Sequence, residues 1–454
     1  MKSSSQYFRA SVISRKTLAA ICLYGLLTMA WLMPIMTGGA DAGAGNALRQ
    51  IIYLTIFGTS LVAIQAFKHP LRIIRIPIGV LFALGFCWLS VTWSIDSDNS
   101  LRRLLLTTMV LLSIFMLVRI TGYKLAVQIH LRLMLLLLGV SYAVVVIAPG
   151  LGVHQSNEAT AEEIIGAWRG IFGHKNVAGP AMSIIILTTL FAPFRQRKWI
   201  ALLTIVAATF FLYKTQSKTS ASLVAVAASM GYLVGILRPK YSALSIVSFL
   251  GTIFALIAAA WLNWSVISSH FLQEDSLTGR GSIWIALTAF WQDHFWGTGF
   301  GAFWNISGYQ PIVQYVSERS FVTGQASGHS GYLDLLVTIG PVGLILVLVG
   351  LGIAPLCQLL SDQSITARRR ALLAGIILYA LMANFTETSV FDRDHPVNVT
   401  LLMAVALVPV AGGSREPMPN PSPPQILTQR RFRTIAKRTS RSSTQSTAQR
   451  EQGV

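Results

Sequence analysis

Residues 331–359 read GYLDLLVTIGPVGLILVLVGLGIAPLCQL, and this stretch contains a single charged side chain, that of Asp334. About 20 apolar residues in a helix cross the ~30 Å hydrocarbon core of a membrane. A run of this length is typical of a transmembrane helix that is long or tilted. Gly328, His329 and Ser330 come directly before it, so the sequence places an imidazole at one end of this span.

The composition of the whole chain agrees with this assignment. Of its 454 residues, 53% are hydrophobic and 12% are charged, and the mean hydropathy is +0.59. Soluble domains carry about 25% charged residues, roughly twice the share found here. The composition therefore excludes an ordinary soluble enzyme and indicates a membrane protein that crosses the bilayer several times.

Apolar runs of similar length recur along the chain. They predict spans at about residues 17–37, 48–67, 73–93, 101–119, 125–148, 176–194, 199–213, 219–237, 241–264, 331–359, 371–388 and 396–411. We therefore expect an all-α polytopic membrane protein with about 12 transmembrane helices. A large, partly helical outer loop would lie between the ninth and tenth helices.

The distribution of charge predicts the orientation. Cytoplasmic loops are enriched in Lys and Arg. With a cytoplasmic N-terminus and alternating sides, 26 of the 36 Lys and Arg fall inside and 14 of the 17 Asp and Glu fall outside. We accordingly expect a cytoplasmic N-terminus at 1–16, a transmembrane domain at 17–411 and a cytoplasmic tail at 412–454. The basic residues lie in short clusters between apolar runs, which argues against a nucleic-acid partner.

The tail differs from the rest of the chain in composition. It begins with several prolines and continues with Arg, Ser, Thr and Gln. Such a sequence has too little apolar surface to fold, so we predict disorder, with basic residues available to anionic lipid headgroups at ~1 kcal/mol each. The three cysteines (Cys22, Cys87 and Cys357) lie in apolar runs without metal-ligand spacing, and we expect neither a disulfide framework nor a zinc site.

Two outer loops, at about 149–175 and 265–330, are longer than connections require, and long loops are commonly functional. The second contains Trp284, Trp291, Trp296 and Trp304. Its stretch 282–291 is too short to span a membrane comfortably, so we predict an amphipathic helix in the interface with its indole rings at headgroup depth. The following Gly297-Thr298-Gly299-Phe300-Gly301 predicts a turn, and it is weak as a phosphate-binding motif because no strand precedes it.

Three polar clusters would lie at the outer boundary of the membrane: Arg169–Asn176, Leu277–Trp284 and Gly328–Asp334. Guanidinium groups bind pyrophosphate in a bidentate manner, which makes Arg169 and Arg280 candidate ligands for a lipid-linked phosphate. Lys175 would add a point charge at the start of a helix. A neutral His329 would be a candidate base for an incoming hydroxyl group.

Each candidate also has a structural interpretation. Arg169 and Lys175 would also serve as interface anchors, and Arg280 as a solvated cation. His329 could equally be a loop residue that is hydrogen-bonded to the backbone. His174 could pack against other side chains or cap a helix, whether or not it also contacts a ligand. Asp334 would either orient an imidazole ring or cap its own helix. For four further outer cations, snorkelling at helix ends is the default expectation, and these are Arg102, Arg103, Lys214 and Lys218.

Together these motifs resemble the O-antigen ligase and oligosaccharide polymerase superfamily, near its exopolysaccharide-polymerase branch. The resemblance rests on Phe172-Gly173-His174-Lys175-Asn176, on Leu277-Thr278-Gly279-Arg280 followed by Trp284 and the Gly297–Gly301 turn, and on His329-Ser330-x-x-Leu333. With the twelve-span layout it covers about residues 15–410. Each motif is short, and it is their order and spacing that makes the resemblance specific.

The resemblance implies an inverting, metal-independent glycosyl transfer, without a cofactor, at the periplasmic face of the bacterial inner membrane. It implies His329 as the base and Arg280 and Arg169 as ligands of the undecaprenyl pyrophosphate of the donor. We add Lys175, His174 and Trp284 as substrate-binding residues and Asp334 as an orienting residue. Expected partners are the undecaprenyl-pyrophosphate-linked oligosaccharide, a growing glycan acceptor and membrane lipids, with other polysaccharide-export proteins as further candidates.

Three functions remain open from the sequence. The first is a polymerase of lipid-linked repeat units. The second is a ligase of the same chemistry with a different acceptor, such as lipid A-core or a protein. The third belongs to another class, a lipid-linked sugar transporter or flippase. A transporter should place ionisable groups near the bilayer midplane, whereas this sequence concentrates them at the outer edge.

Overall fold

The computed structural model of the protein describes residues 14–36, 47–156, 164–192, 198–237, 280–306, 310–316 and 325–412, with a few isolated positions between 243 and 255. The described residues all belong to one unit, Met1–Gly412. The predicted ninth span at 241–264 therefore lies mostly outside the described residues. The same holds for the tail and for most of 1–16.

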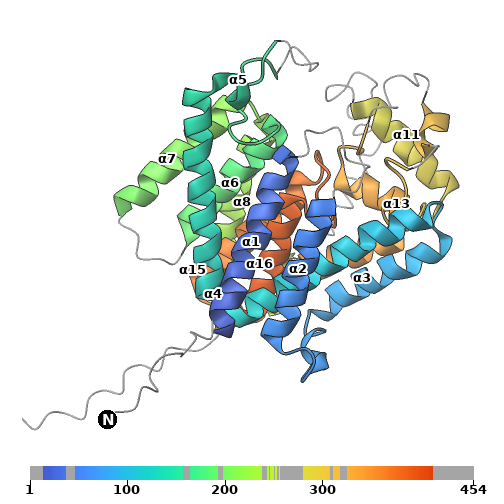
Figure 1. The fold of residues 1–454 in the computed structure, drawn as a ribbon, viewed down its shortest axis with the longest axis horizontal. Coiled ribbons are helices and arrows are strands. Elements are labelled where there is room, and N and C mark those ends of the chain that lie inside the picture. Colours follow the sequence, from blue (N-terminus) through green and yellow to red (C-terminus); the bar gives the residue numbers. More distant parts are fainter. Residues whose placement is uncertain are drawn as a thin grey trace, which may run out of the picture. The chain divides into compact units, whose positions relative to one another are not determined.

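The described residues form helices and, apart from one isolated bridge between Val153 and Trp168, no β-pairing (Figure 1). The longer helices are α1 (Arg15–Met36), α2 (Ala47–Ile64), α3 (Ile78–Ser90), α4 (Ser97–Ile147), α6 (Lys175–Phe191), α7 (Lys198–Lys214), α8 (Lys218–Ile236), α11 (Arg280–Asp293), α13 (Gly331–Leu348), α15 (Ala367–Ala383) and α16 (Pro396–Ala411). Short helical segments are η1 (Pro70–Arg72), η2 (Val91–Trp93), α5 (Pro149–Gly152), η5 (Pro311–Tyr315), the π-helical η6 (Val349–Ile353) and α14 (Ala354–Ser361).

Three of these helices are long and apolar enough to cross a membrane, namely Ser97–Ile147, Lys218–Ile236 and Gly331–Ser361. Shorter apolar helices occur at Leu48–Ile64, Ile78–Trp93, Lys175–Phe191 and Pro396–Ala411. These helices confirm the all-α membrane class, while the count of twelve spans stays a prediction. The predicted boundary at 388 is wrong, because α15 ends at Ala383 and the chain continues as a loop.

α4 is two helices joined at Gly122, where the backbone has φ 73° and ψ 169°. This break separates the two apolar runs that the sequence predicts at 101–119 and 125–148. The side chain of Asp96 begins the first of them by accepting a hydrogen bond from the backbone N–H of Asn99. A single stretch of 51 residues therefore contains both of these predicted spans.

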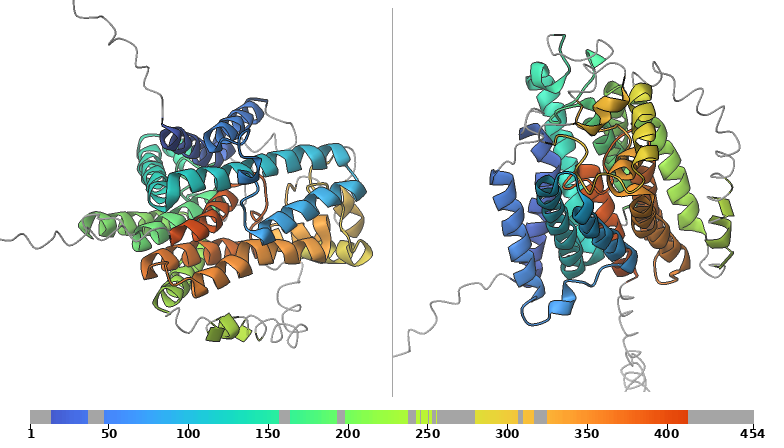
Figure 2. Two further views of the ribbon diagram at one scale, coloured as in Figure 1. Left: turned by 90° about the horizontal axis from the view of Figure 1, so that it is seen from below. Right: turned by 90° about the vertical axis from the view of Figure 1, so that its right-hand side faces the viewer.

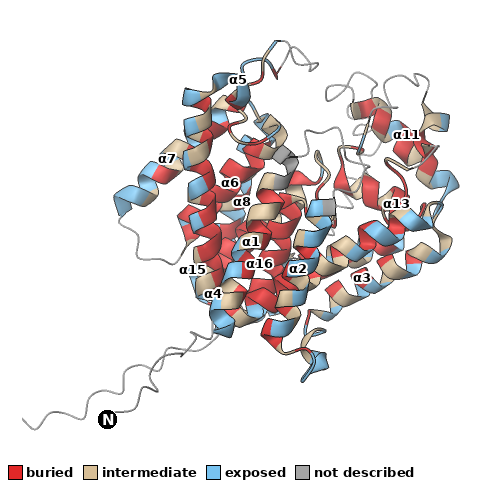
Figure 3. Ribbon diagram, in the orientation of Figure 1, coloured by how far each residue is buried: buried red, intermediate tan, exposed pale blue. Residues whose placement is uncertain are grey.

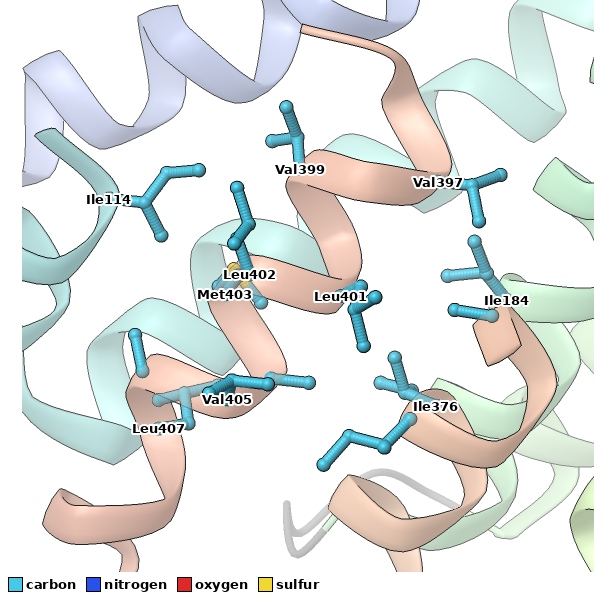
Figure 4. Close-up of a cluster of buried hydrophobic side chains, with 14 of the residues drawn as sticks. Ile114, Ile184, Ile376, Val397, Val399, Leu401, Leu402, Met403, Val405 and Leu407 are labelled. Carbon is cyan, nitrogen blue, oxygen red and sulfur yellow. The ribbon is translucent and has the colours of Figure 1, made fainter. Parts of the chain in front are cut away.

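Among the described helices, α16 is the most buried (Figure 3). It packs between α4 and α1 on one side and α15 on the other (Figure 2). Its Val399, Leu401 and Leu402 contribute to a cluster that also includes Ile114 of α4 and Ile376 of α15 (Figure 4). A helix that is apolar all round belongs in the interior of a bundle, which explains its position.

α13 is also broken, at Gly340, where φ is 66°. The next residue, Pro341, has no N–H, so the carbonyl of Val337 lacks its helical donor. The backbone N–H of Thr298 donates to this carbonyl at 2.9 Å, and the N–H of Gly299 donates to the carbonyl of Thr338 at 2.8 Å. The turn at 297–301 therefore docks on the break in α13.

The apolar face of α11 packs against protein. Ile283, Leu287 and Phe290 form a second core cluster with Phe303 and Val337. The helix predicted at 282–291 is thus present as α11, but its apolar face is covered by the segment that follows it and by α13. A side chain at Gly297 would collide with the carbonyl of Thr338 at 2.6 Å, which explains the glycine at the docking point.

Basic residues gather at the ends of helices remote from α11. The guanidinium group of Arg119 is within electrostatic reach of Arg72 and Arg75. That of Arg369 lies over the ring of Tyr123 at 4.7 Å and donates to the carbonyl of Ala411. These residues belong to segments predicted to be cytoplasmic, and the orientation itself stays a prediction.

Candidate functional site

A cavity of about 490 Å³ lies where the N-terminal ends of α4, α6, α13 and α16 come together. Its lining comprises Arg103, His174, Asn176, Phe300, Gly301, Phe303, Trp304, Asn305, Ala326, Ser327, His329, Gly331, Asp334, Leu335, Thr338, Glu387, Thr388, Val390, Phe391, Asp392, Arg393 and His395. Segments that are far apart along the chain thus share one site.

Strained backbone is concentrated in this lining. Among the described residues, six that are not glycine have a positive φ, and four of these line the cavity: Asn305 (50°), His329 (52°), Phe391 (60°) and Arg393 (29°). Such residues cost free energy and cluster at functional sites, where the surrounding structure holds them. Their concentration in one lining marks this cavity as the candidate functional site.

His329 lies in segment 325–330, between α11 and α13. Its Nε2 is 3.4 Å from Oε1 of Gln325. Burial and the nearby charge of Arg280 lower the pKa of His329 to about 4. The imidazole is therefore neutral at physiological pH and retains a lone pair that can accept a proton.

Asp334 organises the segment that carries His329. Its buried carboxylate accepts hydrogen bonds from the backbone N–H of Gly328 at 3.0 Å and from Nε1 of Trp304 at 2.7 Å. The hydroxyl group of Thr388 donates to the same carboxylate. Within the described part of the chain, Asp334 thus bonds to the backbone beside His329 and not to the imidazole ring.

Trp284 supports the same segment from α11. Its Nε1 donates to the carbonyl of Gly328 at 2.9 Å. Trp304, by contrast, is buried and bonded to Asp334. The prediction that the tryptophans of this loop form an interfacial belt therefore fails for Trp304, because its indole N–H is used inside the protein.

Arg280 begins α11 and lies beside the cavity. Its Nη2 is 3.0 Å from Oε1 of Glu387, a residue of the cavity lining, and its Nη1 donates to the carbonyl of Thr386. Burial raises the pKa of Glu387, and the charge of Arg280 opposes this shift. A guanidinium group has five N–H donors, so these bonds leave capacity for an anion.

His174 lines the cavity at the start of α6. Burial and the charges of His154, Lys175, His329 and Arg169 lower its pKa to about 4. This electrostatic coupling places Arg169 and Lys175 near the site, although neither is among the described lining residues. Arg169 donates from Nε to the carbonyl of Leu151 at 2.8 Å, so part of its donor capacity holds the 149–175 loop together.

Arg103 was expected to snorkel at a helix end, and the structure contradicts this. Its side chain is buried and donates to the carbonyls of Gly301, Trp304 and Asn305. It therefore fixes the segment that follows the 297–301 turn and lines the cavity as well. A buried guanidinium group satisfies its donors in this way because leaving them unpaired would be costly.

The loop at 384–395 is the part of the site that sequence reasoning missed. Asn384 accepts from the N–H groups of Ser389 and Val390 at 2.9 and 2.8 Å. Asn398 accepts from the N–H of Phe391 at 3.1 Å. The available signal was the charge-rich run Asp392-Arg393-Asp394-His395 between two apolar helices.

The charges of this loop are paired locally. Nε of Arg393 is 3.2 Å from Oδ1 of Asp392, and the positive charges of Arg393 and His395 outweigh burial to lower the pKa of Asp392. Asp394 forms an ion pair with Arg49 of α2. Within the described residues, no three His, Cys, Asp or Glu side chains are placed to hold a metal ion together.

Comparison with known proteins gives a family match for the middle of the chain. Residues 181–348 match the family model described as O-antigen ligase. The matched stretch includes Arg280, Trp284, His329 and Asp334, and it stops before the loop at 384–395. No curated protein gives a significant match to the chain. Over residues 181–348, this integral membrane protein is therefore similar to the O-antigen ligase and oligosaccharide polymerase superfamily.

Proposed function

We propose that the protein is a polymerase that joins undecaprenyl-pyrophosphate-linked oligosaccharide repeat units into an exopolysaccharide. The observation that carries this proposal is the cavity in which a neutral His329 lies beside His174, with Arg280 bonded to the lining residue Glu387. A proton acceptor beside a cationic group is what glycosyl transfer from a lipid pyrophosphate requires.

The proposed step is a direct displacement. His329 takes the proton of an acceptor sugar hydroxyl group as its oxygen forms a bond to the anomeric carbon of the donor. The bond between that carbon and the pyrophosphate oxygen breaks on the opposite face, so the configuration inverts. The pyrophosphate carries away the electron pair, and guanidinium groups stabilise its charge.

Arg280 is the proposed principal pyrophosphate ligand, and Arg169 and Lys175 add positive charge around the start of α6. His174 and Trp284 complete the proposed substrate-binding set. Asp334 is a positioning residue, since it holds the backbone next to His329. We place the site on the periplasmic face of the inner membrane, with both termini in the cytoplasm, because the basic residues gather at the other helix ends.

The test is polymer formation from lipid-linked repeat units by the purified protein in lipid vesicles. We expect His329→Ala to reduce the rate of glycosyl transfer by about 10²–10⁴-fold, the usual contribution of a general base. His294→Ala is the matched control, because His294 is exposed and is not among the lining residues. Near-normal chain length from a folded His329→Ala variant would refute the assignment of the base.

The ligase alternative has the same chemistry and the same family model. The same assay separates it from the polymerase by the acceptor that is consumed. Growth of the glycan on a second lipid-linked repeat supports the polymerase, whereas transfer to lipid A-core or to a protein supports the ligase. Movement of lipid-linked sugar across the vesicle membrane without bond formation would instead indicate a transporter.

A further inference from the structure

Two histidines, rather than the usual hydroxyl or carboxylate side chains, cap the first turn of α6. His174 is the N-cap residue, with extended backbone angles (φ −148°, ψ 151°), and its Nδ1 accepts from the backbone N–H of Asn176 at 3.1 Å. Nε2 of His154 accepts from the backbone N–H of Lys175 at 3.3 Å. These bonds satisfy two N–H groups that a helix start leaves without partners.

This capping bond fixes the tautomer of His174. A ring nitrogen that accepts a hydrogen bond carries a lone pair and no proton, so the proton of the neutral ring is on Nε2. Burial, and in addition the neighbouring cations Lys175 and Arg169, lower the pKa of His174 and keep its ring in the neutral form. The ring nitrogen that remains for other partners is therefore a donor.

We infer that His174 acts only as a hydrogen-bond donor in the cavity, and that its Nε2–H binds an oxygen atom of the substrate, either of a phosphate or of a sugar. The inference rests on the proposed function of the cavity. His174 then takes no proton from the attacking hydroxyl group, and His174 and His329 have different roles. His329, whose ring nitrogens cap no helix, is the one that accepts the proton.

A neutral donor suits this position. The lining contains the carboxylates of Asp334, Glu387 and Asp392, which would repel a pyrophosphate. The start of α6, a helix of 17 residues, supplies a partial positive charge. An imidazole that both caps this helix and donates into the cavity adds a directed bond without changing the charge of the site.

Two substitutions separate the capping role from the donor role. The amide oxygen of asparagine replaces Nδ1 of histidine, so His174→Asn keeps an N-cap acceptor and loses the donor at Nε2. The longer glutamine places its amide nitrogen near the position of Nε2, so His174→Gln keeps a donor and loses the cap. His69→Asn is the matched control, since His69 is exposed and lies outside the lining.

The measurements are the melting temperature, the dissociation constant for the substrate, and KM and kcat in vesicles. For His174→Asn we expect a melting temperature close to that of the wild type, with affinity for lipid-linked oligosaccharide about 10-fold weaker, as for loss of one hydrogen bond to a charged or polar group. For His174→Gln we expect a lower melting temperature and an affinity within about threefold of the wild type.

Three probes distinguish the source of the bound oxygen. Undecaprenyl pyrophosphate carries only the phosphate oxygens, the free oligosaccharide carries only the sugar oxygens, and the lipid-linked oligosaccharide carries both. Weaker binding of undecaprenyl pyrophosphate to His174→Asn assigns the bond to phosphate. Weaker binding of the free oligosaccharide alone assigns it to sugar.

Two outcomes would overturn the inference. Unchanged affinity of His174→Asn for every probe would leave His174 as a helix cap only. A loss of kcat in His174→Asn as large as that in His329→Ala, with unchanged KM, would make His174 a base. Binding is measured without turnover, so the two proposals can fail separately. A wild-type protein that binds the probes but forms no glycosidic bond would refute the proposed function, while the binding data would still test the donor role of His174.

Discussion

Segment 325–330 and loop 384–395 both line the cavity, and both contain non-glycine residues with positive φ, but different side chains hold them. A single carboxylate, that of Asp334, bonds to Gly328 in the first. Two amides, those of Asn384 and Asn398, bond to the backbone of the second. The first part of the lining is therefore held at one residue, Gly328, by Asp334 and by Trp284, whereas the second is held at separate points along the loop.

What the two parts present to the cavity also differs. Segment 325–330 presents a neutral imidazole, and loop 384–395 presents the ion pair of Asp392 and Arg393. Thr388 of the loop donates to Asp334, so the two parts share one hydrogen-bonded centre. This comparison predicts that changes at Asp334 affect both parts, while changes at either asparagine affect one.

The largest effect is expected from Asp334→Ala. The substitution leaves the buried N–H groups of Gly328 and Trp304 without acceptors, at about 1–3 kcal/mol for each group. We expect the free energy of unfolding to fall by about 3 kcal/mol and the rate of transfer by about 100-fold. Chemical denaturation and the vesicle assay measure the two quantities.

Asp334→Asn is the matched variant for this prediction. It keeps the shape and one acceptor oxygen, but an NH2 group, which cannot accept a hydrogen bond, replaces the other oxygen, so an intermediate loss is expected. A wild-type rate in Asp334→Ala would show that segment 325–330 keeps its conformation without this carboxylate.

A smaller effect is expected from Asn384→Ala. The variant loses the bonds to Ser389 and Val390 but retains those of Asn398, so we expect a loss of about 2 kcal/mol in the free energy of unfolding and about a 10-fold lower rate. The double variant with Asn398→Ala should lose more than the sum of the single changes. Strict additivity would contradict a loop held jointly by the two amides.

The smallest effect concerns pH. Because the pKa of His329 is lowered to about 4, the ring stays neutral as the pH falls, and we expect kcat/KM to change by less than about twofold between pH 7.5 and 5.5. A base with the ordinary pKa of ~6.5 would lose about 10-fold at pH 5.5. Glu387→Gln is the control variant. Burial raises the pKa of Glu387, so the charge of this side chain changes at low pH in the wild type, and the substitution removes that change.

The helical body of the protein was predictable from the sequence because its apolar runs have the length and composition of spans. α11 was predictable for a related reason, since the apolar and polar residues of the stretch 282–291 alternate with the period of a helix. The elements that cover the apolar face of α11 were not predictable, because such a face has the same sequence pattern whether it contacts lipid or protein. The pairing with Phe303 and Val337 depends on tertiary structure.

The candidate site was predictable only in part. His329 and His174 were proposed from local motifs, and both line the cavity. The place of Arg103 was not predictable, because an arginine near the start of an apolar run has the same sequence pattern whether it snorkels or folds inward. The strain at Phe391 and Arg393 leaves no mark in the residue types, since neither is a glycine.

The docking of the 297–301 turn on the broken α13 has a consequence for how the protein is made. Two carbonyls at the break, those of Val337 and Thr338, receive their hydrogen bonds from this turn, and an unsatisfied carbonyl in hydrocarbon costs several kcal/mol. We therefore expect insertion of this span to be coupled to docking of the preceding turn during biogenesis.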